Sequence, residues 1–111
     1  MASFDEVWNA LKTNVVKYSE DNWNEFKDDA INDGKDFLEK CKDDLMRWTD
    51  LLSTGKLTQD DFEWLLLGKK DLAEMEALKQ KGMAKKKLSL FQKGLLDTVK
   101  TTVIGIINIK I

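Results

Sequence analysis

The chain has no histidine, no proline and a single cysteine among its 111 residues. Histidine is the usual general base and metal ligand near neutral pH, so its absence argues against triad hydrolases and imidazole-based metal sites. One thiol cannot form an intrachain disulfide or a cysteine-rich zinc site. We therefore expect a protein that is not an enzyme and that has no cofactor.

The one cysteine, Cys41, lies between Lys40 and Lys42. Neighbouring lysines lower the pKa of a thiol, which would make it more reactive. Cys41 also falls on the apolar stripe of a helical pattern, and a small buried core residue is the better interpretation. We assign it no chemical role.

The composition is 42% apolar and 34% charged, which is typical of one ordinary globular domain over residues 1–111. The first residues carry acids and lack the apolar run of a secretory signal, so we expect a cytoplasmic protein.

The net charge of -2 hides an asymmetry: residues 1–55 hold 13 acids and 7 bases, whereas residues 56–111 hold 7 acids and 11 bases. This favours contact between the two halves, or between two copies of the chain.

Apolar residues recur at helical spacing along nearly the whole chain. In residues 4–53 they return every three to five positions, apart from one gap of seven across Gly34, and residues 59–107 continue in the same way. The stripe drifts around the helix in the sense expected of supercoiled packing. The pattern predicts an all-α protein.

Two local signals mark a boundary between the halves. Gly55 suits a left-handed helix stop, and Thr58 followed by Asp61 resembles a capping box that starts a second helix. Leu57 and Phe62 fit the hydrophobic staple that accompanies such a start. At the other end of the chain, Ser3 is a suitable N-cap.

The sequence therefore predicts a long antiparallel helical hairpin of residues 4–53 and 59–107 that packs as a four-helix bundle. Two forms satisfy this prediction. An unbroken hairpin would dimerise, whereas breaks near Gly34 and Gly82 would let one chain form its own bundle. Pairing about Gly55 would bring acidic residues 20–36 opposite lysine-rich residues 75–92, and Trp48 opposite Trp64.

Residues 62–67 have apolar side chains on two sides of a helix. With Leu72, Met75 and Leu78 the apolar arc widens to about 220°, against roughly 100° for an ordinary surface helix. This segment is expected to touch two neighbours, one of them in another chain, although a core role for Trp64 is an equal alternative. The expected contact residues are Trp64, Leu67, Met75 and Leu78.

The C-terminal segment suggests a second function. Lys85, Lys86 and Lys87 precede an apolar stretch that Asp97, Lys100 and other polar residues interrupt, which disfavours a spanning helix. A basic amphipathic helix lying on a membrane, or binding an acidic partner, is the alternative. The β-branched residues of 103–111 are also compatible with a short strand.

Nucleic-acid binding is not expected. The isoelectric point is about 5.2, the only arginine is Arg47 in the acidic half, and Phe91 is the only aromatic residue near the lysines. The sequence thus predicts a non-catalytic helical protein that acts by self-assembly or by contact with another protein, with membrane interaction as the alternative.

Overall fold

The structure, a computed structural model, describes residues 3–110, with side chains through residue 108, and these residues are helical without a strand. This confirms the all-α prediction. The elements are α1 (Phe4–Asn22), the 3-10 turn η1 (Asn24–Phe26), α2 (Lys27–Ser53), α3 (Gln59–Leu67), the 3-10 turn η2 (Lys70–Leu72), α4 (Glu76–Gln80) and α5 (Lys85–Lys110).

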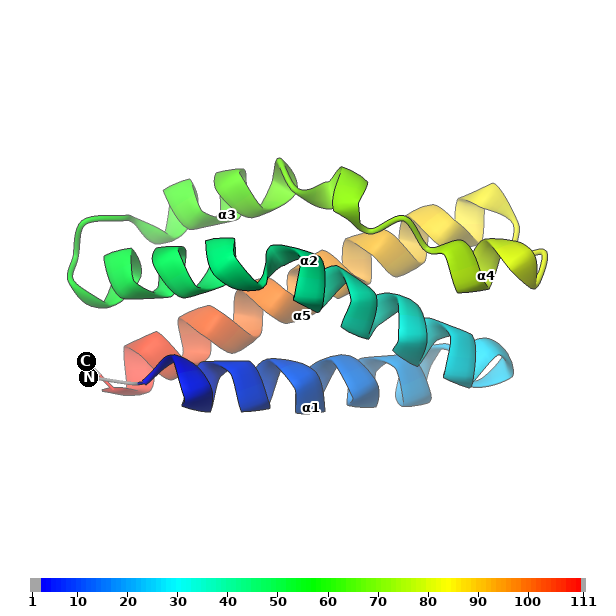
Figure 1. Ribbon diagram of the computed structural model, residues 1–111, viewed down its shortest axis with the longest axis horizontal. Helices are drawn as coiled ribbons and strands as arrows, with labels where there is room; N and C mark the ends of the chain where they lie inside the picture. Colours follow the sequence, from blue (N-terminus) through cyan, green and yellow to red (C-terminus); the bar gives the residue numbers. More distant parts are fainter. Residues whose placement is uncertain (1–2, 111) are drawn as a thin grey trace.

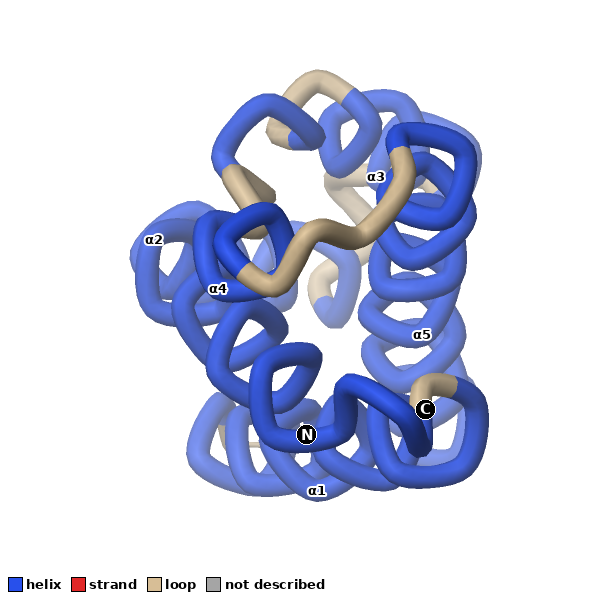
Figure 2. The backbone as a smooth tube through the Cα atoms, turned by 90° about the vertical axis from the view of Figure 1, so that its right-hand side faces the viewer, coloured by secondary structure: helices blue, strands red, loops and turns tan. Residues whose placement is uncertain are grey.

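Successive elements run back and forth along the long axis of the molecule (Figure 1). α2 returns antiparallel beside α1, the segment from α3 to α4 reverses again, and α5 returns to the end where α1 begins. Seen from one end, α1 lies below α2 and α5 (Figure 2). The Cα extents are 43 × 23 × 18 Å. An unbroken helix of residues 4–53 would be about 75 Å long, so a helix of that length does not fit these dimensions.

The first reversal falls at Trp23, and α2 runs unbroken through Gly34, where a break was one of the two alternatives. Trp23 leaves the helical conformation (φ -129°, ψ 42°), and its ring packs edge-on against Phe91 with centroids 5.6 Å apart. Gly34 lies buried inside α2. A Cβ on Gly34 would stand 2.5 Å from Cγ1 of Val15, so this glycine serves the close approach of α1 and α2.

Residues 59–107 are also not one helix. Of the two alternatives near Gly82, the structure has the break, because Gly82 has φ 82° between α4 and α5. A second break separates α3 from α4, where Met75 adopts a left-handed conformation (φ 54°). The predicted helix starts are correct: Ser3 Oγ accepts from the Glu6 N–H (3.3 Å), and Thr58 Oγ1 accepts from the Asp61 N–H (3.0 Å). Gly55, at φ 76°, follows the end of α2 as expected.

One continuous apolar core runs through the molecule. It includes Val7, Trp8, Leu11 and Val15 of α1; Ala30, Phe37, Leu38, Cys41, Leu45, Trp48 and Leu52 of α2; Phe62 and Leu66 of α3; Leu78 of α4; and Leu88, Phe91, Leu95, Leu96, Val99, Val103 and Ile107 of α5. The helix α5 extends through the region where a strand was the alternative, and Ile111 lies outside the described residues.

A buried carboxylate joins α2 to α4. Asp33 accepts hydrogen bonds from the backbone N–H groups of Ala77 (3.0 Å) and Leu78 (2.8 Å). The residue that precedes α4, Met75, makes no side-chain capping bond. Asp33 therefore supplies from another helix the acceptor that a local N-cap residue would normally provide.

Ion pairs do join the two halves of the chain, but not between the two stretches that were predicted to face each other. Lys40 lies 3.1 Å from Glu74, and Lys69 lies 2.9 Å from Asp44, so ion pairs join α2 to the segment between α3 and α4. The lysines of residues 79–87 form no ion pair with acidic residues 20–36 among the described side chains. The chain reverses within that acidic stretch, which changes what lies opposite it.

Candidate interaction site

The orientation of α3 is set by the side chains on its inner face. Phe62 is fully buried and meets Trp48 edge-on, with ring centroids 6.1 Å apart and ring planes at 74°. Leu66, one turn later, is also buried. Thr58 caps the start of the helix. These contacts turn the opposite side of α3, including Trp64, toward solvent.

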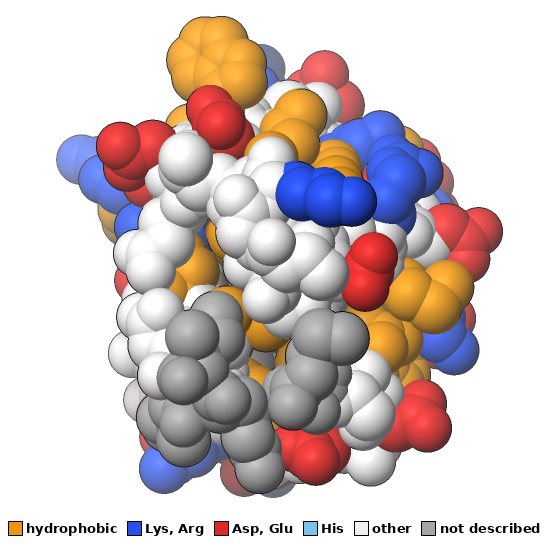
Figure 3. Space-filling view, turned by 90° about the vertical axis from the view of Figure 1, so that its left-hand side faces the viewer, with side chains coloured by type: hydrophobic (Ala, Val, Ile, Leu, Met, Phe, Trp, Pro, Cys, Tyr) orange, Lys and Arg blue, Asp and Glu red, His pale blue; other side chains and the backbone are white. Residues whose placement is uncertain are grey.

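Trp64 is the most exposed large apolar side chain among those described, at 76%. The predicted pairing of Trp48 with Trp64 is therefore wrong, because Phe62 takes the place opposite Trp48. Leu67 is 46% exposed, and Leu90 of α5 is 55% exposed. Hydrophobic side chains stand out at the top of Figure 3, over α3. Apolar surface thus gathers where α3 and α5 meet.

Polar side chains hold the α3 segment to α5 at two separated points. Near one end, Gln59 Nε2 donates to Asn108 Oδ1 (3.1 Å). Near the other, Gln92 Nε2 donates to the carbonyl of Lys70 (2.8 Å). Between these points the surface is hollowed into a groove of about 400 Å³.

The α3–α5 groove has an apolar lining with charged residues among it. It is lined by Glu63, Leu66, Leu67, Leu90, Lys93, Gly94, Leu96, Asp97 and Lys100. Such a mixture, mostly apolar with a few polar groups, is typical of a binding surface. Leu90 and its neighbours on α5 were not predicted as site residues.

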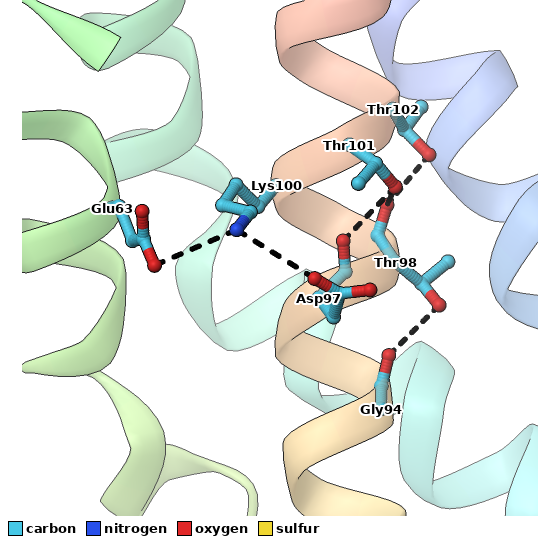
Figure 4. Close-up of polar contacts among 7 residues, drawn as sticks. All are labelled: Glu63, Gly94, Asp97, Thr98, Lys100, Thr101 and Thr102. Carbon is cyan, nitrogen blue, oxygen red and sulfur yellow. Dashed lines mark hydrogen bonds and ion pairs between the residues drawn. The ribbon is translucent and has the colours of Figure 1, made fainter. Parts of the chain in front are cut away.

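Lys100 links the charged groups of the groove. Its Nζ lies 3.5 Å from a Glu63 oxygen on α3 and 3.6 Å from an Asp97 oxygen on its own helix (Figure 4). The pairs are partly exposed and loose, so they add little to folding stability. Their effect is to place both signs of charge beside the apolar lining.

The four predicted contact residues do not lie together. Trp64 and Leu67 are exposed on α3, whereas Leu78 is fully buried in the core. Met75 is half-buried and packs against the same core at the start of α4. The break after α3 divides the wide apolar arc on which the prediction of two neighbours was based. Leu78 is fully buried, so a partner cannot contact it.

Lys85, Lys86 and Lys87 are exposed in the first turn of α5. None forms an ion pair with a described side chain. Farther along α5, Val99, Val103 and Ile107 are buried. Because these core contacts occupy the apolar face of the helix, membrane contact through that face would require α5 to leave the core. No helix within the described residues is long and apolar enough to span a membrane.

Cys41 is a core residue, as predicted. It is fully buried, and burial together with the negative charge of Asp44 raises the pKa of its thiol to about 11. The positive charges of Lys69 and Lys40 have the opposite, smaller effect. The thiol therefore stays protonated near neutral pH, which leaves it a poor nucleophile.

The described residues contain no cluster of three or more acidic, cysteine or histidine side chains arranged to hold a metal ion.

Comparisons with known proteins find no matching family model, no similar curated protein and no similar solved structure.

Proposed function

We propose that this chain is a non-catalytic helical protein that acts by protein–protein contact or self-assembly through the surface formed by Trp64, Leu67 and Leu90. The exposure of Trp64 carries the proposal. Tryptophan is enriched among the residues that dominate binding energy at protein interfaces. Here it stands beside an apolar groove, which is the arrangement that a partner can cover.

The available energy is large enough to matter. A tryptophan buries roughly 150–250 Å² of surface, so covering Trp64 removes enough apolar area from water to contribute about 3 kcal/mol. A micromolar complex has a binding free energy of about -8 kcal/mol. Burial of Trp64, Leu67 and Leu90 therefore offsets a substantial part of the entropic cost of association, which is about 4–15 kcal/mol.

Assembly, in this proposal, adds to a fold that one chain already forms. α1, α2, the α3–α4 segment and α5 act as a self-contained four-helix bundle, and the single continuous core within one chain supports this. The partner surface is then separate from the core. Removing it leaves the helices intact.

The test is the molar mass in solution, measured by light scattering on a sizing column over a range of concentrations. We expect the wild-type chain to associate, and the double variant Trp64→Ala/Leu67→Ala to have a lower mass with unchanged helicity by circular dichroism. Met46→Ala is the matched control, because Met46 is as exposed as Leu67 but lies on α2, outside the groove. An oligomer that survives the double substitution would rule out this surface as the interface.

A further inference from the structure

Trp64 and the α3–α5 groove belong to one surface. Glu63, Leu66 and Leu67 of α3 line the groove, and Trp64 does not. On a helix, the Trp64 side chain is rotated about 60° from Leu67 around the helix axis, so it projects from α3 at the outer edge of the groove. The surface therefore carries an exposed side chain that can act as an anchor, Trp64, and beside it a groove that Trp64 does not fill.

This juxtaposition suits a contact between identical surfaces. In a twofold contact each copy offers the same surface, so whatever one copy inserts, the other inserts as well. An exposed ring beside an apolar groove meets this requirement, because a single contact covers two rings and two grooves. The volume of about 400 Å³ lies within the range of sites that hold small-molecule-sized groups, so it accommodates an indole ring.

The charges of the groove also favour a second copy over a strongly charged partner. Glu63 and Asp97 balance Lys93 and Lys100, so the groove carries both signs in equal number. Two such surfaces meet without an excess of like charge. Lys93 forms no ion pair with a described side chain, which leaves it able to meet Glu63 or Asp97 of the other copy.

We infer that the partner of this surface is a second copy of the chain, in a twofold dimer in which Trp64 of each copy inserts into the α3–α5 groove of the other. The inference rests on the proposed function and specifies its partner and contact. It differs from simple apolar association in one respect: the anchor and the groove have separate roles and can be removed separately.

Two variants separate these roles. Trp64→Ala removes the anchor and keeps the groove, whereas Leu90→Glu places a charge in the groove and keeps the anchor. Both positions are more than half exposed, so the variants are expected to fold, which circular dichroism checks. Met46→Ala again serves as the control.

Dimerisation is measured by sedimentation equilibrium for each chain alone and, after mixing two variants, by native mass spectrometry. Each variant alone should dimerise at least about tenfold more weakly than the wild type, as expected for loss of a central interface contact. The mixture of Trp64→Ala with Leu90→Glu should form a heterodimer in preference to either homodimer, because that pair keeps one anchor in one intact groove.

The other outcomes overturn the inference in distinguishable ways. A mixture that forms no heterodimer, from variants that each fail to dimerise, rejects the insertion but leaves Trp64 as part of an interface. Unchanged dimerisation of the Trp64→Ala variant rejects both the inference and the proposed surface. A wild-type chain that stays monomeric up to high concentration rejects the second copy and leaves a different protein as the partner under the proposed function.

Discussion

At the scale of single residues, two glycines with opposite surroundings provide a direct test of how α1 and α2 pack. Gly34 allows α1 to approach α2, since an added Cβ would meet Val15 Cγ1 at 2.5 Å. Val15 is fully buried and β-branched, so it has little freedom to move aside. Gly105 lies inside α5, and an added Cβ there meets nothing within 4 Å.

Gly34→Ala should therefore lower the free energy of unfolding by about 1–3 kcal/mol, the usual cost of overpacking a core. Gly105→Ala should raise it by about 0.5–1 kcal/mol, because alanine restricts the unfolded chain and favours the helix. Urea unfolding followed by circular dichroism measures both. If Gly34→Ala is stabilising as well, the close helix contact at this position is wrong.

At the scale of elements, Asp33 is the clearest link between two helices that are far apart in the sequence. Asp33→Ala removes the acceptor for the N–H groups of Ala77 and Leu78, which are buried or partly buried. Leaving buried donors unpaired costs about 1–3 kcal/mol each, so a loss of roughly 2–3 kcal/mol is expected. Asp43→Ala, at an exposed position of α2, is the control and should change the stability by less than about 0.5 kcal/mol.

Hydrogen exchange locates the effect of this substitution. The amides of α4 should lose protection in Asp33→Ala, while those of α1 keep it, because the lost bonds join α2 only to α4. A uniform loss of protection over all helices would mean that Asp33 acts on the whole core and not on α4.

The Asp33 carboxyl group also makes the stability of the fold depend on pH. Burial raises the pKa of Asp33 above its ordinary value of 3.8, and the hydrogen bonds from Leu78 and Ala77 oppose this rise. Between pH 3.8 and the raised pKa, the Asp33 carboxyl group is deprotonated in the unfolded chain but still protonated in the folded chain. The contribution of Asp33 to stability therefore falls as the pH rises. The stability of the wild type relative to Asp33→Asn should therefore decline from pH 3.8 upward through the raised pKa. A difference that grows over this range would show that the N–H groups outweigh burial.

The elements that sequence reasoning located are those set by local chemistry. The start of α3 follows from the Thr58 side chain and its bond to Asp61, and the turn at Gly82 follows from a left-handed glycine. The reversal at Trp23 was not predicted, because Trp23 and Phe26 continue the helical apolar spacing. In the structure the Trp23 ring contacts Phe91, far along the chain, and local spacing does not reveal such a contact.

The candidate site also has one part that local sequence predicts and one part that depends on contacts between distant segments. The exposure of Trp64 and Leu67 is compatible with a two-sided apolar helix, which local sequence reveals. The groove needs a second wall, Leu90 with its neighbours, which is known only once α5 is placed beside α3. Leu78 shares the apolar pattern of Trp64, but the break between α3 and α4 turns it into the core.

At the scale of the whole molecule, the core and the proposed interface are separate, and this separation has a measurable consequence. The buried residues form one cluster within one chain, whereas Trp64 and Leu67 stand outside it. Removal of these two side chains should leave the fold intact. Dimerisation, in contrast, stabilises only the associated state, so it makes the unfolding temperature depend on protein concentration.

The unfolding midpoint of the wild type should therefore rise with concentration. For a dimer of this size the rise is about 3 °C for each tenfold increase, because one tenfold step is about 1.4 kcal/mol against an unfolding entropy of about 2.1 cal/mol/K per residue. The midpoint of Trp64→Ala/Leu67→Ala should not change with concentration, while its transition remains cooperative and its helicity is kept. Calorimetry over a hundredfold range of concentration measures both. If the double variant loses its cooperative transition, Trp64 and Leu67 support the fold itself, and the separation of core from interface fails.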